Sequence, residues 1–305
     1  MPNIISVRQF NKEEVEKILE RASAMERAFK EGKVPPLLVG KTVASVFFEP
    51  STRTRLSFET AALKLGANVI SAENARENSS SFKGETIEDT VRVLSAYADA
   101  IVMRHYEEGA VEKAAKVSGK PIINAGDGAQ EHPSQAFLDL YTIKKEKRCL
   151  DNLNIVFVGD ILHSRTIHSL LPLLLMYPNN TFCFVSPKEL ALPEEYRQEL
   201  TNKKISFKEM YNLKEALSLA DVLYMTRVQK ERFEDMREYE KVKDLFILQA
   251  EDLKDMKKEA IIMHPLPRVN EIDPAIDTDK RAAYFRQAEN GLYIRLALLP
   301  YALGL

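Results

Sequence analysis

The segment Glu49–Arg55 contains residues whose types and spacing could bind a phosphate group. It reads Glu-Pro-Ser-Thr-Arg-Thr-Arg and directly follows the apolar run Val43–Phe48. A helix that begins near Ser51–Thr54 would direct its unsatisfied backbone N–H groups and the positive end of its dipole toward the strand end. Hydroxyl groups and a guanidinium in that first turn would complete a phosphate cradle. The alternative is an ordinary helix cap with solvated arginines, since Ser and Thr are common N-caps.

Arginine and histidine also follow several other apolar runs that have the composition of strands. Open parallel sheets bind their ligands beyond the carboxyl ends of the strands. The chain has a formal net charge of −2, so this local gathering of donors predicts a site for more than one anionic group. The segments at these strand ends are Arg104-His105, His132-Pro133-Ser134-Gln135, His163-Ser164-Arg165-Thr166, Thr226-Arg227-Val228-Gln229 and His264-Pro265-Leu266-Pro267-Arg268.

Two of these features also have an ordinary structural explanation. A histidine before a proline is usually structural, but His132 begins a predicted helix with Gln135 one turn on, so both side chains can face one point. The segment Asn78–Glu85 is typical of a flexible polar loop, although its Lys83 could reach a ligand as a mobile point charge. Both interpretations stay open from these residues alone. The chain has neither a Walker P-loop motif nor a G-x-G-x-x-G motif after a strand, which argues against those nucleotide sites.

The elements that must position these residues alternate between strand-like apolar runs and stretches of helical period. This alternation predicts parallel sheets with helices on their faces. Four strands precede the helical pattern Pro133–Lys147 and about six follow it, which favours two doubly wound α/β domains joined by helices. The last segment, Ala288–Leu303, is predicted to be a helix with an apolar face. The expected strands are Thr42–Phe48, Asn68–Ser71, Ala100–Arg104, Pro121–Asn124, Asn154–Gly159, Thr181–Val185, Ile205–Lys208, Val222–Thr226, Phe246–Leu248 and Ala260–Met263.

Length and composition are those of a soluble globular protein. The 305 residues are 45% hydrophobic and 29% charged, an ordinary balance. The slight net negative charge argues against a nucleic-acid partner. Cys149 and Cys183 have no metal-ligand spacing, so we expect structural thiols, no metal and a reduced, cytoplasmic setting. The longest apolar run, Leu170–Tyr177, is too short to span a bilayer, so no membrane association is expected.

Three of the motifs together resemble the carbamoyltransferase family, in order and over essentially the whole chain. They are Ser51-Thr52-Arg53-Thr54-Arg55, His132-Pro133-Ser134-Gln135 and His264-Pro265-Leu266-Pro267-Arg268. The first is shared by the aspartate and ornithine branches. Lys83-Gly84-Glu85, Thr226-Arg227-Val228-Gln229 and the His-Pro-Leu-Pro-Arg motif resemble the aspartate branch, whereas the His-Cys-Leu-Pro and Ser-Met-Gly motifs expected of the ornithine branch are not present. Arginines also suit the two carboxylates of aspartate better than the cationic side chain of ornithine.

The resemblance implies a role for each matching residue. Residues implied to bind carbamoyl phosphate are Ser51, Thr52, Arg53, Thr54, Arg104, His132, Gln135, Pro265 and Leu266. Those implied to bind aspartate are Ser79, Lys83, Arg165, Arg227 and Gln229. The catalytic set is Arg53, Thr54, Lys83, Arg104, His132 and Gln135. The implied domains are 1–133 plus the C-terminal helix 288–305 for carbamoyl phosphate, and 134–287 for aspartate.

The reaction implied by the resemblance is carbamoyl transfer to the α-amine of L-aspartate, which gives N-carbamoyl-L-aspartate and phosphate. It is an early step of de novo pyrimidine biosynthesis and needs no cofactor. The family also implies a homotrimer whose active sites are shared between subunits, and possible regulatory chains. Two alternatives stay open: a carbamoyltransferase for another amine such as ornithine, and a non-catalytic anion-binding regulatory module.

Overall fold

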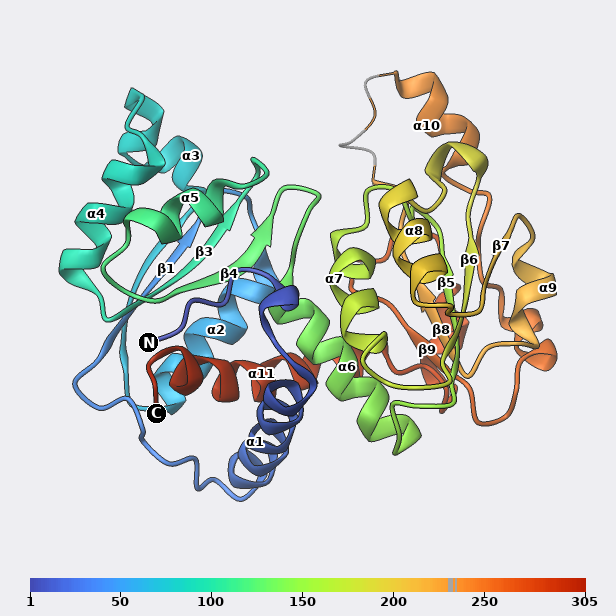
Figure 1. Cartoon of the computed structure of the whole chain (residues 1–305), viewed down its shortest axis with the longest axis horizontal. Coiled ribbons are helices and arrows are strands. Elements are labelled where there is room, and N and C mark those ends of the chain that lie inside the picture. Colours follow the sequence, from blue (N-terminus) through green and yellow to red (C-terminus); the bar gives the residue numbers. More distant parts are fainter. Residues whose placement is uncertain (230–232, 234) are drawn as a thin grey trace. The chain divides into compact units, whose positions relative to one another are not determined.

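The chain forms two compact units, each built on its own parallel sheet (Figure 1). The computed structural model describes residues 1–229, 233 and 235–305, apart from the side chains of Ser80 and Ser81. The first unit comprises Met1–Tyr141, His168–Leu173 and Glu289–Leu305, and the second comprises Thr142–Ile167 and Leu174–Ala288. The predicted fold class of two α/β domains with parallel sheets is confirmed.

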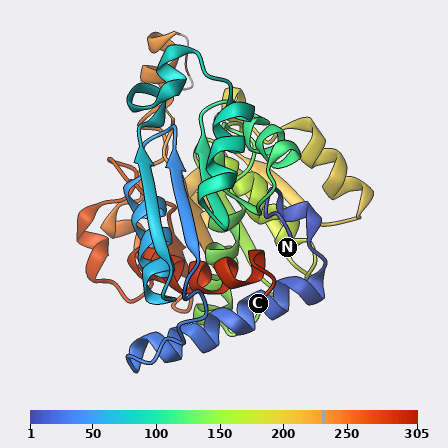
Figure 2. The ribbon, with the colours of Figure 1, turned by 90° about the vertical axis from the view of Figure 1, so that its left-hand side faces the viewer.

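The first unit has a four-stranded sheet of order β2-β1-β3-β4, with every pair parallel. The inner strands are almost wholly buried, whereas β2 lies at the edge and is largely exposed. Figure 2 presents this edge, with β2 and β1 side by side. The bounds are β1 Thr42–Phe47, β2 Asn68–Glu73, β3 Ala100–His105 and β4 Ile122–Asp127.

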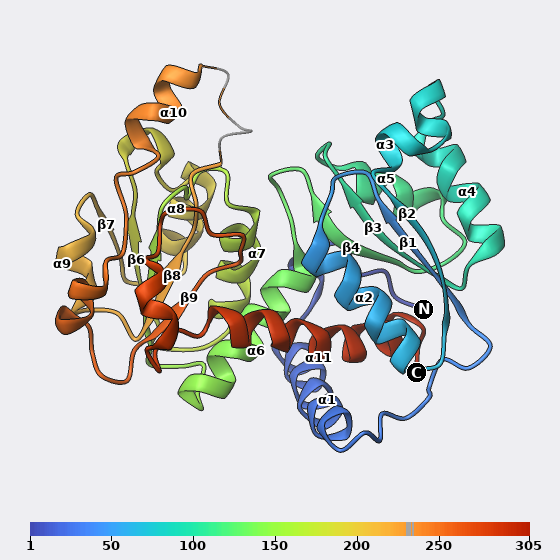
Figure 3. The same ribbon diagram turned by 180° about the vertical axis from the view of Figure 1, so that it is seen from behind.

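Helices cover both faces of this sheet. One face packs against α4 and α5 through the cluster that contains Val46, Val91 and Val111. Helices α2 and α11 lie on the other face, as Figure 3 shows. The helical bounds are η1 Val7–Gln9, α1 Lys12–Lys30, α2 Thr52–Lys64, α3 Ala75–Asn78, η2 Ser80–Lys83, α4 Ile87–Tyr97, α5 Ala110–Val117, α6 Pro133–Lys147 and α11 Tyr284–Ala302.

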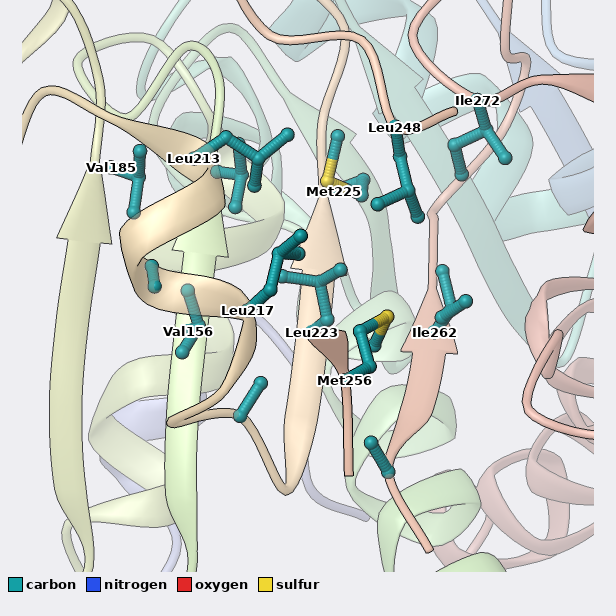
Figure 4. Close-up of a cluster of buried hydrophobic side chains, with 14 of the residues drawn as sticks. Val156, Val185, Leu213, Leu217, Leu223, Met225, Leu248, Met256, Ile262 and Ile272 are labelled. Carbon is teal, nitrogen blue, oxygen red and sulfur yellow. The ribbon is translucent and has the colours of Figure 1, made fainter. Parts of the chain in front are cut away.

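The second unit has a five-stranded parallel sheet of order β7-β6-β5-β8-β9. Figure 4 shows the apolar cluster on one of its faces, where Leu213 and Leu217 of α9 pack over Val156, Leu223 and the neighbouring strands. The bounds are β5 Asn154–Val158, α7 Arg165–Leu174, β6 Thr181–Val185, η3 Lys188–Leu190, α8 Glu194–Asn202, β7 Phe207–Met210, α9 Leu213–Leu217, β8 Val222–Met225, α10 Met236–Val242, η5 Ala250–Asp255, β9 Ile261–Met263 and η6 Pro274–Thr278.

The element predictions were largely correct, with one clear error. The predicted helix Pro133–Lys147 is confirmed at both ends, and the last helix begins at Tyr284, a turn earlier than predicted. The predicted strand Phe246–Leu248 is wrong, because Leu248 makes only an isolated bridge with Ile272. Its apolar side chains instead fill the core beside β9, and burial alone produced the strand-like pattern.

Candidate active site

The start of α2 has the geometry of an anion site. The chain leaves β1 at Phe47, and Ser51 occupies the N-cap position in extended conformation, with φ −158° and ψ 99°. The Ser51 side chain makes no capping hydrogen bond, so its hydroxyl does not satisfy the N–H groups of the first turn. Those groups and the positive end of the 13-residue helix therefore remain oriented for an anion. The predicted helix start near Ser51–Thr54 is confirmed.

The side chains of this first turn divide into two roles. Thr52 and Arg53 are exposed, while Thr54 is buried. Desolvation by the surrounding chain lowers the pKa of Arg53, but a guanidinium stays charged at neutral pH. Arg55 faces away from this group and forms ion pairs with Glu59 at 3.2 Å and Glu73 at 2.7 Å. Arg55 is therefore held by acids of the fold, whereas Arg53 is the exposed arginine of this turn.

Arg104 lies at the end of β3, where it pairs in register with Phe47 at the end of β1. Its side chain is buried, with Nη2 3.1 Å from Glu49 Oε1, and Nη1 donates to the carbonyl oxygen of Ala125 at 3.5 Å. These contacts join the guanidinium to the ends of both neighbouring strands. Arg104 is thus fixed at the same sheet edge at which α2 begins.

His132 and Gln135 both lie at the start of α6 and are buried. The backbone N–H of His132 donates to Ser169 Oγ at 2.8 Å, and Gln135 Nε2 donates to Asp139 Oδ1 at 2.9 Å. The NH2 group of Gln135 is therefore directed at Asp139. Its amide oxygen is left as the end that can accept a hydrogen bond from a ligand.

Ser79 and Lys83 lie in another segment of the first unit, at the end of α3 and in η2. Ser79 Oγ donates to the carbonyl oxygen of Ala75 at 2.5 Å, and Lys83 is exposed. The sequence prediction placed both in a polar loop. The structure gives that loop short helical turns, and Asn74, which precedes α3, lies in the left-handed region with φ 50°.

In the second unit, Arg165 and Gln229 meet at one carbonyl oxygen. The oxygen of His163 accepts the backbone N–H of Arg165 at 3.0 Å and Gln229 Nε2 at 2.9 Å. Asp160 follows β5 and is fully buried. Its carboxylate accepts the backbone N–H of His163 at 2.9 Å, and Nδ1 of the His163 ring lies 3.1 Å from Asp160 Oδ1. The loop that follows β5 is thereby joined to the loop that follows β8.

Arg227 follows the last residues of β8, and a close backbone approach sets its position. Thr226 donates its hydroxyl to the carbonyl oxygen of Val158 at 3.0 Å. Gly159 adopts φ +113°, and a Cβ there would lie 2.3 Å from the carbonyl oxygen of Thr226. Only glycine fits such a contact. The ends of β5 and β8 therefore approach closely. Arg227 directly follows this contact, two residues before Gln229.

Pro265 and Leu266 follow β9 in a turn held by His264. Leu266 lies in the left-handed region with φ 55°, and its backbone N–H donates to His264 Nδ1 at 2.8 Å. His264 Nε2 lies 2.7 Å from Glu271 Oε1, and both side chains are buried. A non-glycine residue held in this region is typical of functional turns. Arg268, by contrast, is in a structural ion pair, with Nη2 2.6 Å from Asp277 Oδ2.

Residues 1–229, 233 and 235–305 contain no group of three or more His, Cys, Asp or Glu that could hold a metal ion. Over the same residues, no helix is long and apolar enough to cross a membrane. Both cysteines are free thiols. Burial raises the pKa of the Cys183 thiol to about 11, which agrees with its predicted structural role.

Three acids that hold the predicted site residues were not singled out from the sequence. Glu49 pairs with Arg104, Asp139 accepts from Gln135, and Asp160 organises the His163 loop. Of the three, only Asp139 could have been predicted from the sequence, because it lies one helical turn after Gln135 on a predicted helix. The contacts of the other two depend on which strands are neighbours.

Parallel sheets that carry arginine, histidine and glutamine beyond the carboxyl ends of their strands define an open-sheet α/β protein with ligand sites at those ends. A family model described as the carbamoyl-P binding domain of aspartate/ornithine carbamoyltransferase matches residues 2–145. The model of the Asp/Orn binding domain of the same family matches residues 151–302. The chain belongs to the aspartate/ornithine carbamoyltransferase family.

Several similar proteins are matched over nearly their whole length. The chain is 49% identical over 304 residues to an aspartate carbamoyltransferase catalytic subunit of Bacteroides fragilis, covering 99% of this chain and 97% of that one. The catalytic subunit of M. jannaschii aspartate transcarbamoylase superposes with a TM-score of 0.92 at 48% identity, over 100% and 98% of the two chains. Trypanosoma cruzi aspartate transcarbamoylase, solved with carbamoyl phosphate and aspartate, gives 0.93 at 39% identity, over 98% and 95%.

Proposed function

We propose that this chain transfers the carbamoyl group of carbamoyl phosphate to the α-amine of L-aspartate, giving N-carbamoyl-L-aspartate and phosphate in de novo pyrimidine biosynthesis. The observation that carries the proposal is the uncapped start of α2, with Arg53 beside it and Arg104 at the same sheet edge. Full-length identity near 49% to aspartate carbamoyltransferase catalytic subunits supports it. So does the Trypanosoma cruzi relative solved with both of these substrates.

In the first unit, the proposed carbamoyl phosphate site has two parts. Ser51, Thr52, Arg53 and Thr54 bind the phosphate with the N–H groups of α2. The carbonyl oxygen receives hydrogen bonds from Thr54, Arg104 and His132. The residues proposed to accept from the carbamoyl NH2 group are Gln135 and, through their backbone carbonyls, Pro265 and Leu266.

The proposed aspartate-binding residues in the second unit are Arg165, Arg227 and Gln229. The guanidinium groups of Arg165 and Arg227 suit the two carboxylates of aspartate, because a guanidinium can bind a carboxylate through two parallel hydrogen bonds. The shared carbonyl of His163 holds Arg165 and Gln229 near each other. The two arginines support aspartate over ornithine, whose cationic side chain would require an acid.

The chemistry then needs no cofactor. The neutral α-amine attacks the carbonyl carbon, the carbonyl oxygen gains negative charge, and the C–O bond to phosphate breaks as the tetrahedral intermediate collapses. Thr54, Arg104 and His132 stabilise that oxyanion. The departing phosphate takes the amine proton, since the proposed site is built of cations. Most of the rate comes from this stabilisation and from orienting two anions that repel each other.

We also propose a cytoplasmic homotrimer in which Ser79 and Lys83 act in the site of a neighbouring subunit. The exposure of Lys83 suits that role. Leu56 and Leu63 are exposed on α2 at a spacing of two helical turns, and Ile70 is exposed on the edge strand β2, which supports a subunit contact there. The proposal also includes regulatory chains as partners. Residues 1–133 with 288–305 form the proposed carbamoyl phosphate domain, and 134–287 the aspartate domain.

The test is a product assay with purified protein and carbamoyl phosphate, with either aspartate or ornithine as acceptor. We expect N-carbamoyl-L-aspartate as the product and no citrulline. Arg53→Ala should lower kcat/KM by at least about a hundredfold, the scale on which one charge-stabilising donor acts. Arg55→Ala is not a suitable control, because it breaks structural ion pairs. Arg21→Ala serves as the control for loss of an arginine, because Arg21 is a half-buried residue of α1.

The outcomes separate the alternatives. Citrulline as product would keep the phosphate cradle but assign ornithine as the acceptor. Binding of carbamoyl phosphate with no product from either amine would favour a non-catalytic anion-binding regulatory module. Normal turnover by a well-folded Arg53→Ala protein would remove the phosphate assignment.

A further inference from the structure

A buried acid and a buried arginine lie behind Gln135 and have no role in the reaction proposed above. Asp139 lies one turn after Gln135 on α6 and is 0% exposed, and Arg295 lies on α11 and is 2% exposed. Charged side chains are almost never fully buried unless they are paired. Their burial within the first unit therefore calls for an explanation.

The Arg295 side chain lies among elements that carry the proposed carbamoyl phosphate site. Its guanidinium lies 5.0 Å from the ring centroid of Phe58, which lies on α2 about one turn after Thr54. Gly291, one turn earlier on α11, leaves room for it, since a Cβ there would lie 2.3 Å from Arg295 Nη1. Burial lowers the pKa of Arg295 to about 9, and the negative charge of Asp139 opposes that shift. The arginine thus remains a cation at neutral pH, with Asp139 as its charge partner.

The contact between Asp139 and Gln135 fixes the direction of an amide. A glutamine side chain has a donor end and an acceptor end of nearly the same shape, and an apolar pocket would not distinguish them. An ionised carboxylate only accepts hydrogen bonds. Because Gln135 Nε2 donates to Asp139 Oδ1 at 2.9 Å, the acceptor oxygen is the end left for a ligand.

We propose that Asp139, with Arg295 as its buried counter-ion, is a positioning residue that makes Gln135 selective for an acyl phosphate whose acyl group carries an N–H donor. A carbamoyl group meets this requirement and an acetyl group does not. The inference rests on the proposed function, because Gln135 contacts the carbamoyl NH2 group only in that assignment. Asp139 itself acts through Gln135 and does not touch the substrate.

The test compares two variants that both remove the Arg295 charge. In the first, Asp139→Leu with Arg295→Met, the acceptor for Gln135 is lost. In the matched control, Asp139→Asn with Arg295→Met, an amide oxygen remains to accept from Gln135. The two readouts are kcat/KM for carbamoyl phosphate and the inhibition constant of acetyl phosphate, which shares the phosphate group but replaces NH2 by methyl.

For the leucine variant we expect kcat/KM for carbamoyl phosphate to fall about tenfold, the size of one hydrogen bond. The inhibition constant of acetyl phosphate should change by less than about twofold, because the methyl group makes no use of the Gln135 oxygen. The asparagine control should keep most of the activity with carbamoyl phosphate. A merely structural role for Asp139 would weaken both ligands equally, and that result would overturn the proposal.

A second measurement, on wild-type protein, tests the proposal even if the leucine variant does not fold. In wild-type protein labelled with 15N-glutamine, the Gln135 side-chain signal is identified by its loss in Gln135→Met. We expect one of its two amide protons to exchange slowly with solvent, because it is donated to a buried carboxylate. Exchange of both protons at the rate of a free amide would overturn the proposal. A wild-type protein that makes no carbamoyl aspartate would refute the proposed function, while the exchange measurement would still test the contact.

Discussion

Asp127 allows a prediction about the pH dependence of stability. It ends β4, is 3% exposed, and its Oδ2 accepts the backbone N–H of Gly109 at 3.1 Å, at the start of α5. Burial raises the pKa of Asp127 to about 6, with a smaller contribution in the same direction from the charge of Glu108, while the N–H groups of α5 oppose the rise. The carboxyl group therefore binds a proton more readily in the folded state than in the unfolded chain.

The size and sign follow from that difference. The ordinary value is 3.8, so the pKa rises by about two units, which corresponds to about 3 kcal/mol. An acid whose pKa is raised by folding stabilises the folded state fully when the pH is below its pKa in the unfolded chain. This contribution is lost as the pH rises through its pKa in the folded protein. Wild-type protein should therefore lose up to about 3 kcal/mol from this group between about pH 4 and about pH 7.

The perturbation is Asp127→Asn, which keeps one oxygen as an acceptor for Gly109 but cannot ionise. We would measure urea unfolding by circular dichroism for both proteins at a fixed protein concentration, and take the difference at each pH so that the other groups cancel. The variant should gain stability relative to wild type by about 2 to 3 kcal/mol from about pH 4.5 to about pH 7.5. A difference that stays constant with pH, or that falls as the pH rises, would refute the raised pKa.

Two further predictions concern the second unit. Gly159→Ala places a Cβ 2.3 Å from the carbonyl oxygen of Thr226 and should destabilise the folded state by about 3 kcal/mol or more. The control is Gly119→Ala, whose Cβ would meet no atom within 4 Å and which should change the thermal midpoint little. Equal midpoints for the two variants would contradict the close approach. Burial is the largest single influence on Glu271 and opposes its ionisation, but the hydrogen bond and charge of His264, together with the backbone N–H of Val269, outweigh it, so the pKa of Glu271 is lowered. Glu271→Gln should therefore cost about 2 kcal/mol at neutral pH and less as the pH falls toward about 4, and a cost that does not depend on pH would argue against an ionised Glu271.

The sequence predicted the elements where local pattern and burial agree. Phe58, Ala61 and Leu65 mark the buried face of α2 by their helical spacing, and all three are buried as that pattern requires. The failure at Phe246–Leu248 has a physical reason: a short apolar run is equally compatible with a strand and with a loop that packs on a core. What distinguishes the two is the pairing: Leu248 makes one isolated bridge with Ile272 and no continuous ladder. The sequence pattern does not contain that information.

The candidate site was predictable by residue type but not by orientation. Arg53 and Arg55 lie on one helix about 200° apart, at 3.6 residues per turn, so they had to face different surroundings. Which of them would be held by Glu59 and Glu73 depends on the position of β2 beside β1. The motif identified the two arginines together, and only the fold assigns one to structure and leaves the other for a ligand.

Buried and half-buried acids explain how a chain of net negative charge can present donors for anions. Each acid contacts a residue that was predicted to bind substrate, or a residue that holds one. A carboxylate taken out of water is costly unless it is hydrogen-bonded, and here those bonds also orient the groups that they hold. Because catalysis by charge stabilisation depends on donors that need not reorganise, these acids contribute to function without touching a ligand. The pairs are Glu49 with Arg104, Asp139 with Gln135, Asp160 with His163, and Glu271 with His264.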